Sequence, residues 1–132
     1  MDPHGTPAEN SSLILHEVNK LLNDTYPFRK AKRESNRLAL RMLPHLRKII
    51  AESDEPLHTS CLISVAGNII DMGILPYYDL EASLKGAMSA GFSKDHYAIS
   101  KERLGEVKKI FYIADNSGEI AFDRLLLEQL RS

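Results

Sequence analysis

The sequence predicts a mainly α-helical chain that continues into one β-strand and a last helix, the start of an α/β domain. Residues 11–108 carry repeated helix signals, namely capping residues followed by apolar side chains at helical spacing. Residues 110–114 form a short apolar run, which is typical of a buried strand. A turn and an amphipathic stretch over residues 119–131 follow at once. The expected fold class is therefore a helical bundle followed by a truncated, Rossmann-like α/β unit.

Three segments are expected along the 132 residues. Residues 1–10 are polar and contain two prolines and a glycine, so we expect a disordered N-terminal segment. Residues 11–108 form the helical domain, and residues 109–132 form the first strand–helix unit of an incomplete α/β domain. The composition, 43% hydrophobic and 27% charged residues, is typical of a soluble globular protein.

Punctuating residues divide the helical domain. The expected N-terminal caps are Ser11 or Ser12, Thr25, Asp79 and Ser100. Pro44 is expected to kink or restart the second helix, and Gly73 is suited to end the most apolar one. The expected helices cover residues 11–22, 25–42, 43–50, 57–72, 80–88 and 100–108.

The strand, expected at about residues 109–114, is alone in the chain. A lone strand cannot satisfy its own backbone N–H and C=O groups. A strand followed at once by a helix is the first half of a βαβ crossover, whose second strand would come next. We therefore expect the chain to be a piece of a larger α/β protein, or to pair its strand with that of a partner.

Charge and composition exclude several classes. A net charge of −1 gives no reason to expect binding to nucleic acid or to an anionic membrane. Cys61 is the only cysteine, which excludes an internal disulfide and a cysteine-rich zinc site. Neither a long apolar run nor a signal peptide is present, so the expected location is cytoplasmic.

The end of the predicted strand carries the chemistry. Asp115 and Asn116 follow the apolar run, and their oxygen atoms are ligands of the kind that Mg²⁺ and Mn²⁺ take. Ser117 and Gly118 turn the chain, and Glu119 begins a helix whose N-terminus suits a phosphate group. In open α/β sheets, ligands bind beyond the carboxyl ends of the strands. The alternative is an ordinary turn in which Asn116 and Ser117 only cap the helix.

One glycine and several polar residues on the predicted helices allow two interpretations each. Gly67 lies late in the most apolar helix, where glycine costs about 1 kcal/mol relative to alanine, so it indicates close approach of a substrate or of another helix. Asn68 and Asp71 beside it are either site residues or satisfied core groups. Lys32 and Asn36 lie one turn apart and either face a phosphate or belong to a solvated helix face.

Asp123 follows Glu119 by one helical turn. It either reaches a metal or favours the positive end of the last helix, and the second role is preferred.

Three segments, in this order, resemble a known family. They are PFRKAKRESN at residues 27–36, SVAGNIIDMG at residues 64–73 and YIADNSGEIAFDR at residues 112–124. Together they resemble the damage-control phosphatases, a family long catalogued as domain of unknown function 89. The resemblance is closest to the archaeal-type members, in which a helical domain precedes the α/β domain, and it covers the middle portion of the family's chain.

The resemblance implies a metal-dependent phosphatase that hydrolyses small phosphorylated metabolites such as sugar phosphates. Asp115 and Asn116 would be catalytic ligands of a divalent metal, either Mg²⁺, Mn²⁺, Co²⁺ or Ni²⁺. The residues that would bind substrate are Asn68, Asp71, Gly118, Glu119, Lys32 and Asn36.

The chain also departs from the family pattern. A Cys-x-x-Cys motif is absent, and so are the further strands that supply a third metal-binding aspartate and a basic phosphate contact, so we expect this fragment alone to be inactive. One alternative is a non-catalytic helical interaction fragment that forms a homo-oligomer through its exposed strand. A haloacid dehalogenase-type phosphotransferase is disfavoured, because Ser117 stands where that class has a second acid.

Overall fold

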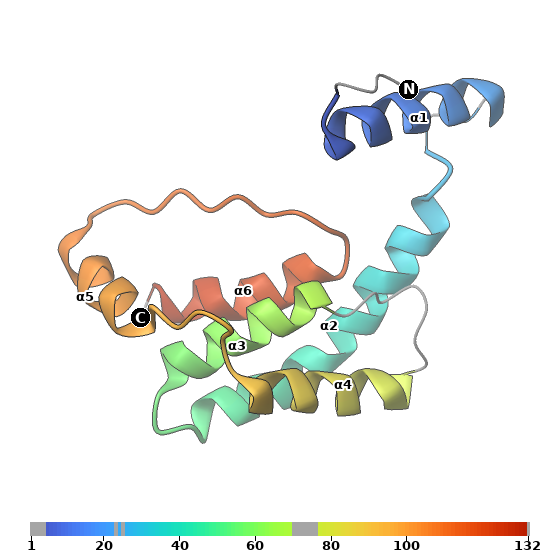
Figure 1. Cartoon of the computed structure of the whole chain (residues 1–132). Coiled ribbons are helices and arrows are strands. Elements are labelled where there is room, and N and C mark those ends of the chain that lie inside the picture. The colour runs from blue at the N-terminus through green and yellow to red at the C-terminus, as the bar shows by residue number, and fades with distance from the viewer. Residues whose placement is uncertain (1–4, 23, 25, 70–76, 132) are drawn as a thin grey trace. The chain divides into compact units, whose positions relative to one another are not determined.

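The computed structural model describes residues 5–22, 24, 26–69 and 77–131, and all of its regular structure is helical (Figure 1). The chain divides into two compact units, residues 1–31 and 32–132. The helices are α1 (Pro7–Leu22), α2 (Arg29–Ala51), α3 (Pro56–Ile69), α4 (Tyr77–Ala90), α5 (Tyr97–Glu106) and α6 (Glu119–Gln129).

The predicted strand, and with it the α/β part of the expected fold class, is wrong. Residues 107–115 run between α5 and α6 without regular structure, and the described residues form no strand. In Figure 1 this connection arches along the length of α6. A strand exists only through hydrogen bonds to a neighbouring strand, and the described residues offer none. The apolar run alone therefore did not establish a Rossmann-like unit.

The first unit contains α1, which begins at Pro7, four residues before the predicted start at Ser11. Thr6 and Glu9 form a reciprocal capping box. The Thr6 backbone N–H donates to Glu9 Oε2 at 2.7 Å, and the Glu9 N–H donates to Thr6 Oγ1 at 3.3 Å. Proline is favourable directly after the cap, because a backbone N–H at this position would have no acceptor within the helix and its loss costs nothing. None of the side chains of α1 is buried.

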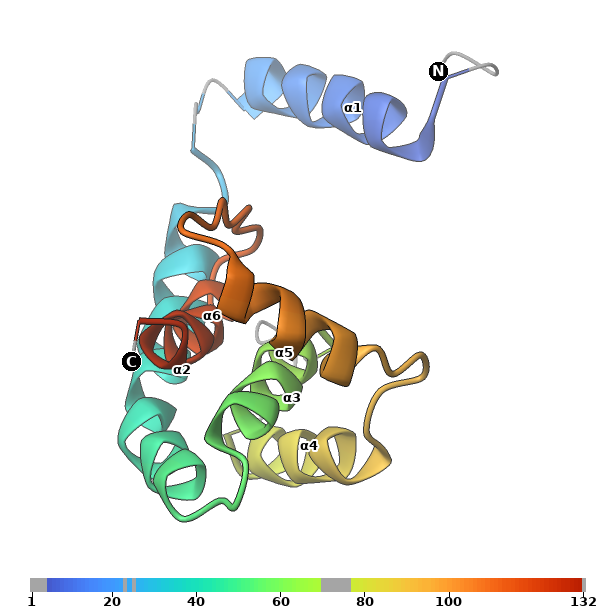
Figure 2. The same cartoon turned by 90° about the vertical axis from the view of Figure 1, so that its left-hand side faces the viewer.

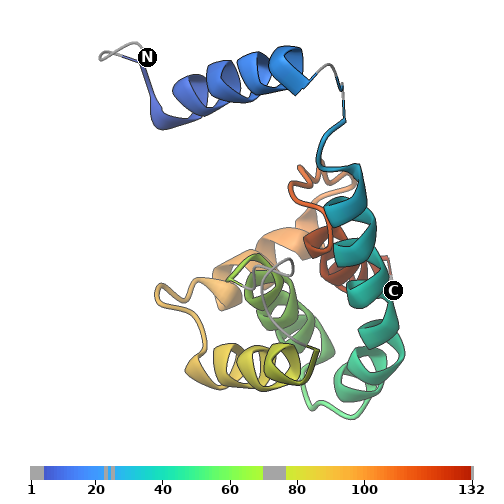
Figure 3. The same cartoon turned by 90° about the vertical axis from the view of Figure 1, so that its right-hand side faces the viewer.

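The core of the second unit is built from four helices. Buried apolar side chains come from α2, α3, α4 and α6, and α3 lies between α4 and α6 in all three views (Figures 1, 2 and 3). The core residues are Ala39, Met42, Leu43, Leu46, Ile50, Ile63, Ala66, Leu84, Ala121, Phe122 and Leu125. Helix α2 is continuous through Pro44, where a kink or restart was expected. Its buried stripe on both sides of Pro44 explains why the helix persists despite a lost backbone hydrogen bond.

Helices α3 and α6 pack closely at Gly67, where there is no room for a β-carbon. A β-carbon at Gly67 would lie 2.5 Å from Cδ2 of Phe122, whose side chain is completely buried. Of the two interpretations of this glycine, the structure supports the approach of another helix. The small residue allows α6 to place an aromatic ring directly on the backbone of α3.

Ion pairs and rings complete the packing of the second unit. Arg47 of α2 donates two hydrogen bonds to the Glu128 carboxylate of α6, at 2.9 and 2.7 Å. Helix α5 begins at Tyr97, three residues before the predicted cap at Ser100, because Asp95 Oδ1 accepts the Tyr97 backbone N–H at 2.8 Å. The Tyr97 ring meets His58 of α3 edge-on, with ring centroids 4.6 Å apart.

Cys61 lies on α3 and is half-buried. Burial raises the pKa of its thiol. Among the residues that the structure describes, no helix is both long and apolar enough to cross a membrane.

Candidate functional site

The candidate site is the turn that leads into α6, and it forms around a glycine. Gly118 is the N-terminal cap of α6 and has φ = +86°, a backbone conformation that side chains with a β-carbon rarely adopt. Asp115 and Asn116, the two predicted metal ligands, lie just before it and are exposed to solvent. Asp115 and Asn116 therefore lie on an exposed turn that ends at Gly118, a glycine with positive φ.

Asn36 joins α2 to this turn. Its side-chain Oδ1 accepts the backbone N–H of Gly118 at 2.7 Å, although the two residues lie 82 positions apart in the chain. Lys32 lies one helical turn before Asn36 on α2 and is exposed. Two of the three sequence segments that carry the family resemblance thus meet at Gly118.

The N-terminus of α6 is less open to an anion than its position suggests. The Gly118 N–H is bound by Asn36, the Ile120 N–H donates to the Asn116 carbonyl at 3.3 Å, and the Ala121 N–H donates to the Gly118 carbonyl at 3.0 Å. Three of the N–H groups that the sequence offered to a phosphate are therefore already engaged. A phosphate bound here needs other donors as well.

Asn116 and Glu119 interact directly. Asn116 Nδ2 donates to Glu119 Oε2 at 3.2 Å across the first turn of α6. In this arrangement the amide nitrogen of Asn116 points toward Glu119, and the amide oxygen is left as an acceptor. The alternative, in which Asn116 and Ser117 only cap the helix, is not what the structure shows, because the cap residue is Gly118 and no side chain makes a capping hydrogen bond there.

The ligand chemistry suits a hard divalent cation, but the ligand count is low. Asp115 and Asn116 supply oxygen donors, as Mg²⁺ and Mn²⁺ prefer. Among the described residues, no three histidine, cysteine, aspartate or glutamate side chains lie close enough to share a metal ion. The described part of the chain therefore shows no complete metal site, and a cation held by two protein ligands would stay largely hydrated.

Asp123 has a role that the sequence did not reveal. Its side chain is 3% exposed, and its Oδ1 accepts a 2.6 Å hydrogen bond from the hydroxyl of Ser64 on α3. The Tyr112 hydroxyl lies 3.4 Å from Ser64 Oγ. Asp123 is thus hydrogen-bonded in the interior. The preferred expectation, a favourable charge at the positive end of the last helix, did not include this contact. The three residues lie in the segments of the family resemblance, but only their spacing in three dimensions reveals the cluster.

Tyr112 responds to these surroundings. Burial raises the pKa of its phenol, and the carboxylates of Asp123 and Glu119 raise it further, although the hydrogen bond with Ser64 acts in the opposite direction. The phenol therefore stays protonated at neutral pH and can only act there as a neutral hydrogen-bonding group.

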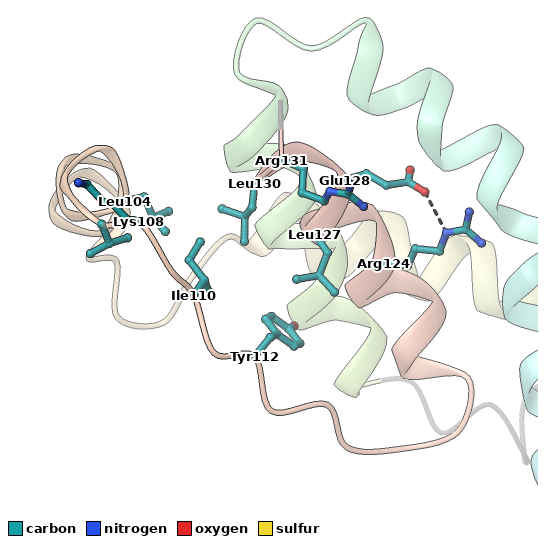
Figure 4. Close-up of a pocket in the computed structure, with 10 residues that line it drawn as sticks. Leu104, Lys108, Ile110, Tyr112, Arg124, Leu127, Glu128, Leu130 and Arg131 are labelled. Atoms are coloured by element: carbon teal, nitrogen blue, oxygen red, sulfur yellow. Dashed lines mark hydrogen bonds and ion pairs between the residues drawn. The ribbon is translucent and has the colours of Figure 1, made fainter.

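A groove of about 650 Å³ opens beside the connection between α5 and α6 (Figure 4). Its walls come from α5, the connection and α6, with leucine and isoleucine side chains facing across it and Arg124 and Glu128 at one side. The lining residues are Leu104, Val107, Lys108, Ile110, Tyr112, Arg124, Leu127, Glu128, Leu130 and Arg131. None of the predicted site residues that the structure describes is among them, so the groove lies apart from the acid–amide turn.

The predicted site residues are only partly brought together. The structure joins Asn36 to Gly118 and Asn116 to Glu119, and Asp115 precedes this pair directly in the chain. Asp71 and the side chain of Asn68 lie outside the described residues, so their place in the site stays a prediction.

The fold and the turn together define a helical module that presents an acid–amide pair at the N-terminus of a helix. Residues 2–132 of the chain match the family model of the damage-control phosphatase ARMT1-like domain. It therefore belongs to this family of damage-control phosphatases, and the resemblance predicted from three segments is confirmed.

Curated archaeal proteins are similar to the chain. A damage-control phosphatase of Archaeoglobus fulgidus is 28% identical over 126 residues, which cover 94% of this chain and 44% of that protein. A damage-control phosphatase of Pyrococcus horikoshii is 32% identical over 130 residues, 95% of this chain and 43% of that protein. An uncharacterized protein of Methanocaldococcus jannaschii is 32% identical, with the same two shares.

The chain thus spans less than half the length of the curated relatives it matches. No solved structure matches the chain.

Proposed function

We propose that this chain is part of a metal-dependent phosphatase that hydrolyses small phosphorylated metabolites such as sugar phosphates. Family membership and the names of two relatives support phosphatase chemistry. The single observation that carries the proposal to this site is the hydrogen bond from Gly118 to Asn36, because it joins two of the resembling segments at the acid–amide turn.

Each residue of the turn has a chemical role in this proposal. Asp115 supplies a carboxylate and Asn116 its Oδ1, while Glu119 holds the Asn116 amide in that orientation. A bound Mg²⁺, Mn²⁺, Co²⁺ or Ni²⁺ ion would supply Lewis-acid polarisation of a phosphoryl oxygen and a more acidic water. Lys32, exposed one turn from Asn36, supplies positive charge for a phosphate.

The remaining ligands are proposed to come from outside the described residues. The described part contains no cluster of three metal-binding side chains, and the relatives are more than twice as long as the matched region. A cation held by two ligands keeps most of its water, and water in an open site weakens the electrostatic contacts on which catalysis depends. We therefore propose that this chain alone hydrolyses phosphomonoesters poorly or not at all.

A phosphatase assay tests the proposal. The chain and a version extended past Ser132 are compared on a chromogenic phosphomonoester, with and without added Mg²⁺, Mn²⁺, Co²⁺ or Ni²⁺. We expect metal-dependent turnover by the extended version only. Asp115→Ala and Asn116→Ala in that version should each lower the rate by at least about 100-fold.

Asp54→Ala serves as the matched control, because Asp54 is an exposed acid before α3, outside the turn. Its rate should equal that of the unmodified protein. Unchanged rates in both turn variants would contradict the mechanism. Turnover by the short chain alone would show that its site is complete without further residues.

A non-catalytic interaction role has one observation in its favour. Phe111 is 89% exposed and Ile113 is 82% exposed, on the connection before the turn. Large apolar side chains on an irregular exposed segment are suited to contact a partner or a second copy of the chain. An extended version without phosphatase activity under every metal would favour this interpretation.

A further inference from the structure

We propose that Asn36 and Asp123 are positioning residues that fix the two ends of the acid–amide loop, residues 113–117. In this arrangement Asp115 and Asn116 are held at the N-terminus of α6 before any cation arrives. The catalytic meaning of this inference rests on the proposed function, whereas the positioning itself is a property of the fold.

The downstream end of the loop is fixed by α2. Gly118 is buried, and a buried N–H without a partner costs about 1–3 kcal/mol. Asn36 supplies that partner at 2.7 Å. Because Asn36 lies on the same helix as five buried apolar core residues, the position of the turn follows the packing of α2. The role needs an acceptor oxygen at position 36 and makes no use of the amide nitrogen.

The upstream end of the loop is fixed by α3 and α6. Asp123 holds the Ser64 hydroxyl at 2.6 Å, and this hydroxyl lies 3.4 Å from that of Tyr112, the residue before the loop. Asp123 is 3% exposed and Ser64 is 8% exposed, so water competes little for the bond between these two side chains. Asp123 thus acts on the loop through Ser64 and does not need to touch substrate or metal.

The two anchors together explain how an exposed loop can have a defined position. Five residues separate Tyr112 from Gly118, and these two residues are held by three different helices of one core. Asp115 and Asn116 are exposed between them. Holding ligands in place in advance lowers the entropy lost when a cation binds.

Amide exchange in the isotope-labelled 132-residue chain tests the downstream anchor. Asn36→Ala should speed hydrogen exchange of the Gly118 amide by about tenfold, since one net hydrogen bond is lost. Asn36→Asp keeps an acceptor oxygen and should restore most of the protection. Arg37→Ala, the exposed neighbour on α2, is the matched control and should leave Gly118 unchanged.

A measurement on the unmodified chain keeps the test decisive if Asn36→Ala does not fold. The scalar coupling across the hydrogen bond, between Gly118 nitrogen and Asn36 Cγ, should give a detectable cross-peak. Its absence would overturn the downstream anchor, and so would an Asn36→Asp chain that exchanges as fast as Asn36→Ala.

The upstream anchor has its own control on the same helix. Ser64→Ala should shift the amide signals of residues 113–117. Ser60→Ala, one turn earlier, removes a buried hydroxyl that donates to the Leu57 carbonyl at 2.8 Å and should leave those signals in place. Equal effects of the two substitutions on the loop would overturn the role of Ser64 and Asp123.

Titration with Mn²⁺ separates this inference from the proposed function. Paramagnetic broadening at Asp115 and Asn116 that weakens several-fold in Asn36→Ala supports both. Loss of Gly118 protection in that variant without any Mn²⁺ broadening supports the anchors and contradicts the metal site. Equal broadening in both chains, with Gly118 exchange unchanged, overturns the anchors and leaves the metal site standing.

Discussion

At the scale of single residues, two glycines set the geometry around α6. Gly118 adopts φ = +86°, which costs other residues roughly 1–2 kcal/mol, and its N–H is bound by Asn36. Gly67 has an ordinary helical conformation, but the ring of Phe122 occupies the space of its missing β-carbon. Gly118 is required by its backbone conformation, and Gly67 is required by the neighbouring ring of Phe122.

Gly67→Ala should destabilise the chain, although alanine is the better helix former. The added β-carbon would lie 2.5 Å from Phe122 Cδ2, and relief of such a contact in a filled core costs about 1–3 kcal/mol. The gain in helix propensity is only about 1 kcal/mol. Gly86→Ala in α4 is the control, because nothing beyond its chain neighbours and its own helix backbone lies within 4 Å of its β-carbon position.

Thermal unfolding followed by circular dichroism distinguishes these two variants. The midpoint should fall by several degrees for Gly67→Ala and stay equal or rise for Gly86→Ala. A Gly67→Ala chain as stable as the unmodified one would show that α3 and α6 can separate without cost.

At the scale of elements, polar bonds join helices that are distant in the chain. Arg47 ties α2 to α6 through Glu128, and Lys101 of α5 pairs with Glu55 at 2.7 Å, just before α3. Arg124, one turn before Glu128 on α6, donates a further bond to the same carboxylate at 2.9 Å. These pairs lie at the surface, so each contributes to orientation more than to stability.

The Arg47–Glu128 pair makes stability depend on acid pH. The hydrogen bonds from Arg47, with a smaller contribution from Arg124 and against the opposing effect of burial, lower the pKa of the Glu128 carboxyl from 4.5 to about 2. The folded state thus holds the carboxylate charged where the unfolded state would protonate it. The pair stabilises the fold above pH 4.5, and this contribution is lost as the pH falls toward 2.

Glu128→Gln measures this contribution. The variant should be less stable than the unmodified chain by about 0.5–1 kcal/mol at pH 7, since the pair is more than a third exposed. The difference should shrink between pH 4 and pH 2. Glu52→Gln removes the weaker 3.8 Å pair with Lys48 and should show no such pH dependence in urea unfolding curves. A difference that is constant from pH 7 to pH 2 would contradict the assignment to Glu128 ionisation.

The sequence predicts local features of these elements well and distant contacts poorly. Helix α6 begins at the predicted residue, Glu119, because the preceding Ser-Gly turn is a local signal. The start of α1 was missed because the Thr6–Glu9 box lies inside a polar segment whose two prolines and one glycine indicated disorder. Apolar character over residues 110–114 could not show whether a strand partner exists. The bond from Gly118 to Asn36 spans 82 residues, and no local pattern encodes it.

At the scale of the whole molecule, burial is concentrated in one of the two units. All the residues of the buried apolar cluster lie in residues 32–132, while α1 has no buried side chain. Several large apolar side chains of α1 are exposed, including Leu21 at 84% and Leu22 at 59%. The buried apolar cluster therefore belongs to the second unit.

Removal of residues 1–25 should leave the unfolding midpoint of the remaining chain nearly unchanged. The reason is that the deleted helix contributes no buried side chain. Leu46→Ala is the positive control, because Leu46 is fully buried and its truncation should cost about 2–5 kcal/mol. A deletion that lowers the midpoint as much as Leu46→Ala would show that α1 stabilises the second unit.

The half-buried thiol of Cys61 gives the chain a built-in chemical reporter. Thiolate is the form that reacts with alkylating and disulfide reagents, and burial on α3 keeps this form scarce at neutral pH. When α3 leaves its neighbours, the thiol becomes exposed and its pKa returns toward the ordinary value. With one cysteine in the sequence, the rate of thiol modification reports on the surroundings of this one position on α3. A faster modification rate in a variant thus reports more frequent separation of the helix that holds Ser64 and Gly67 from its neighbours.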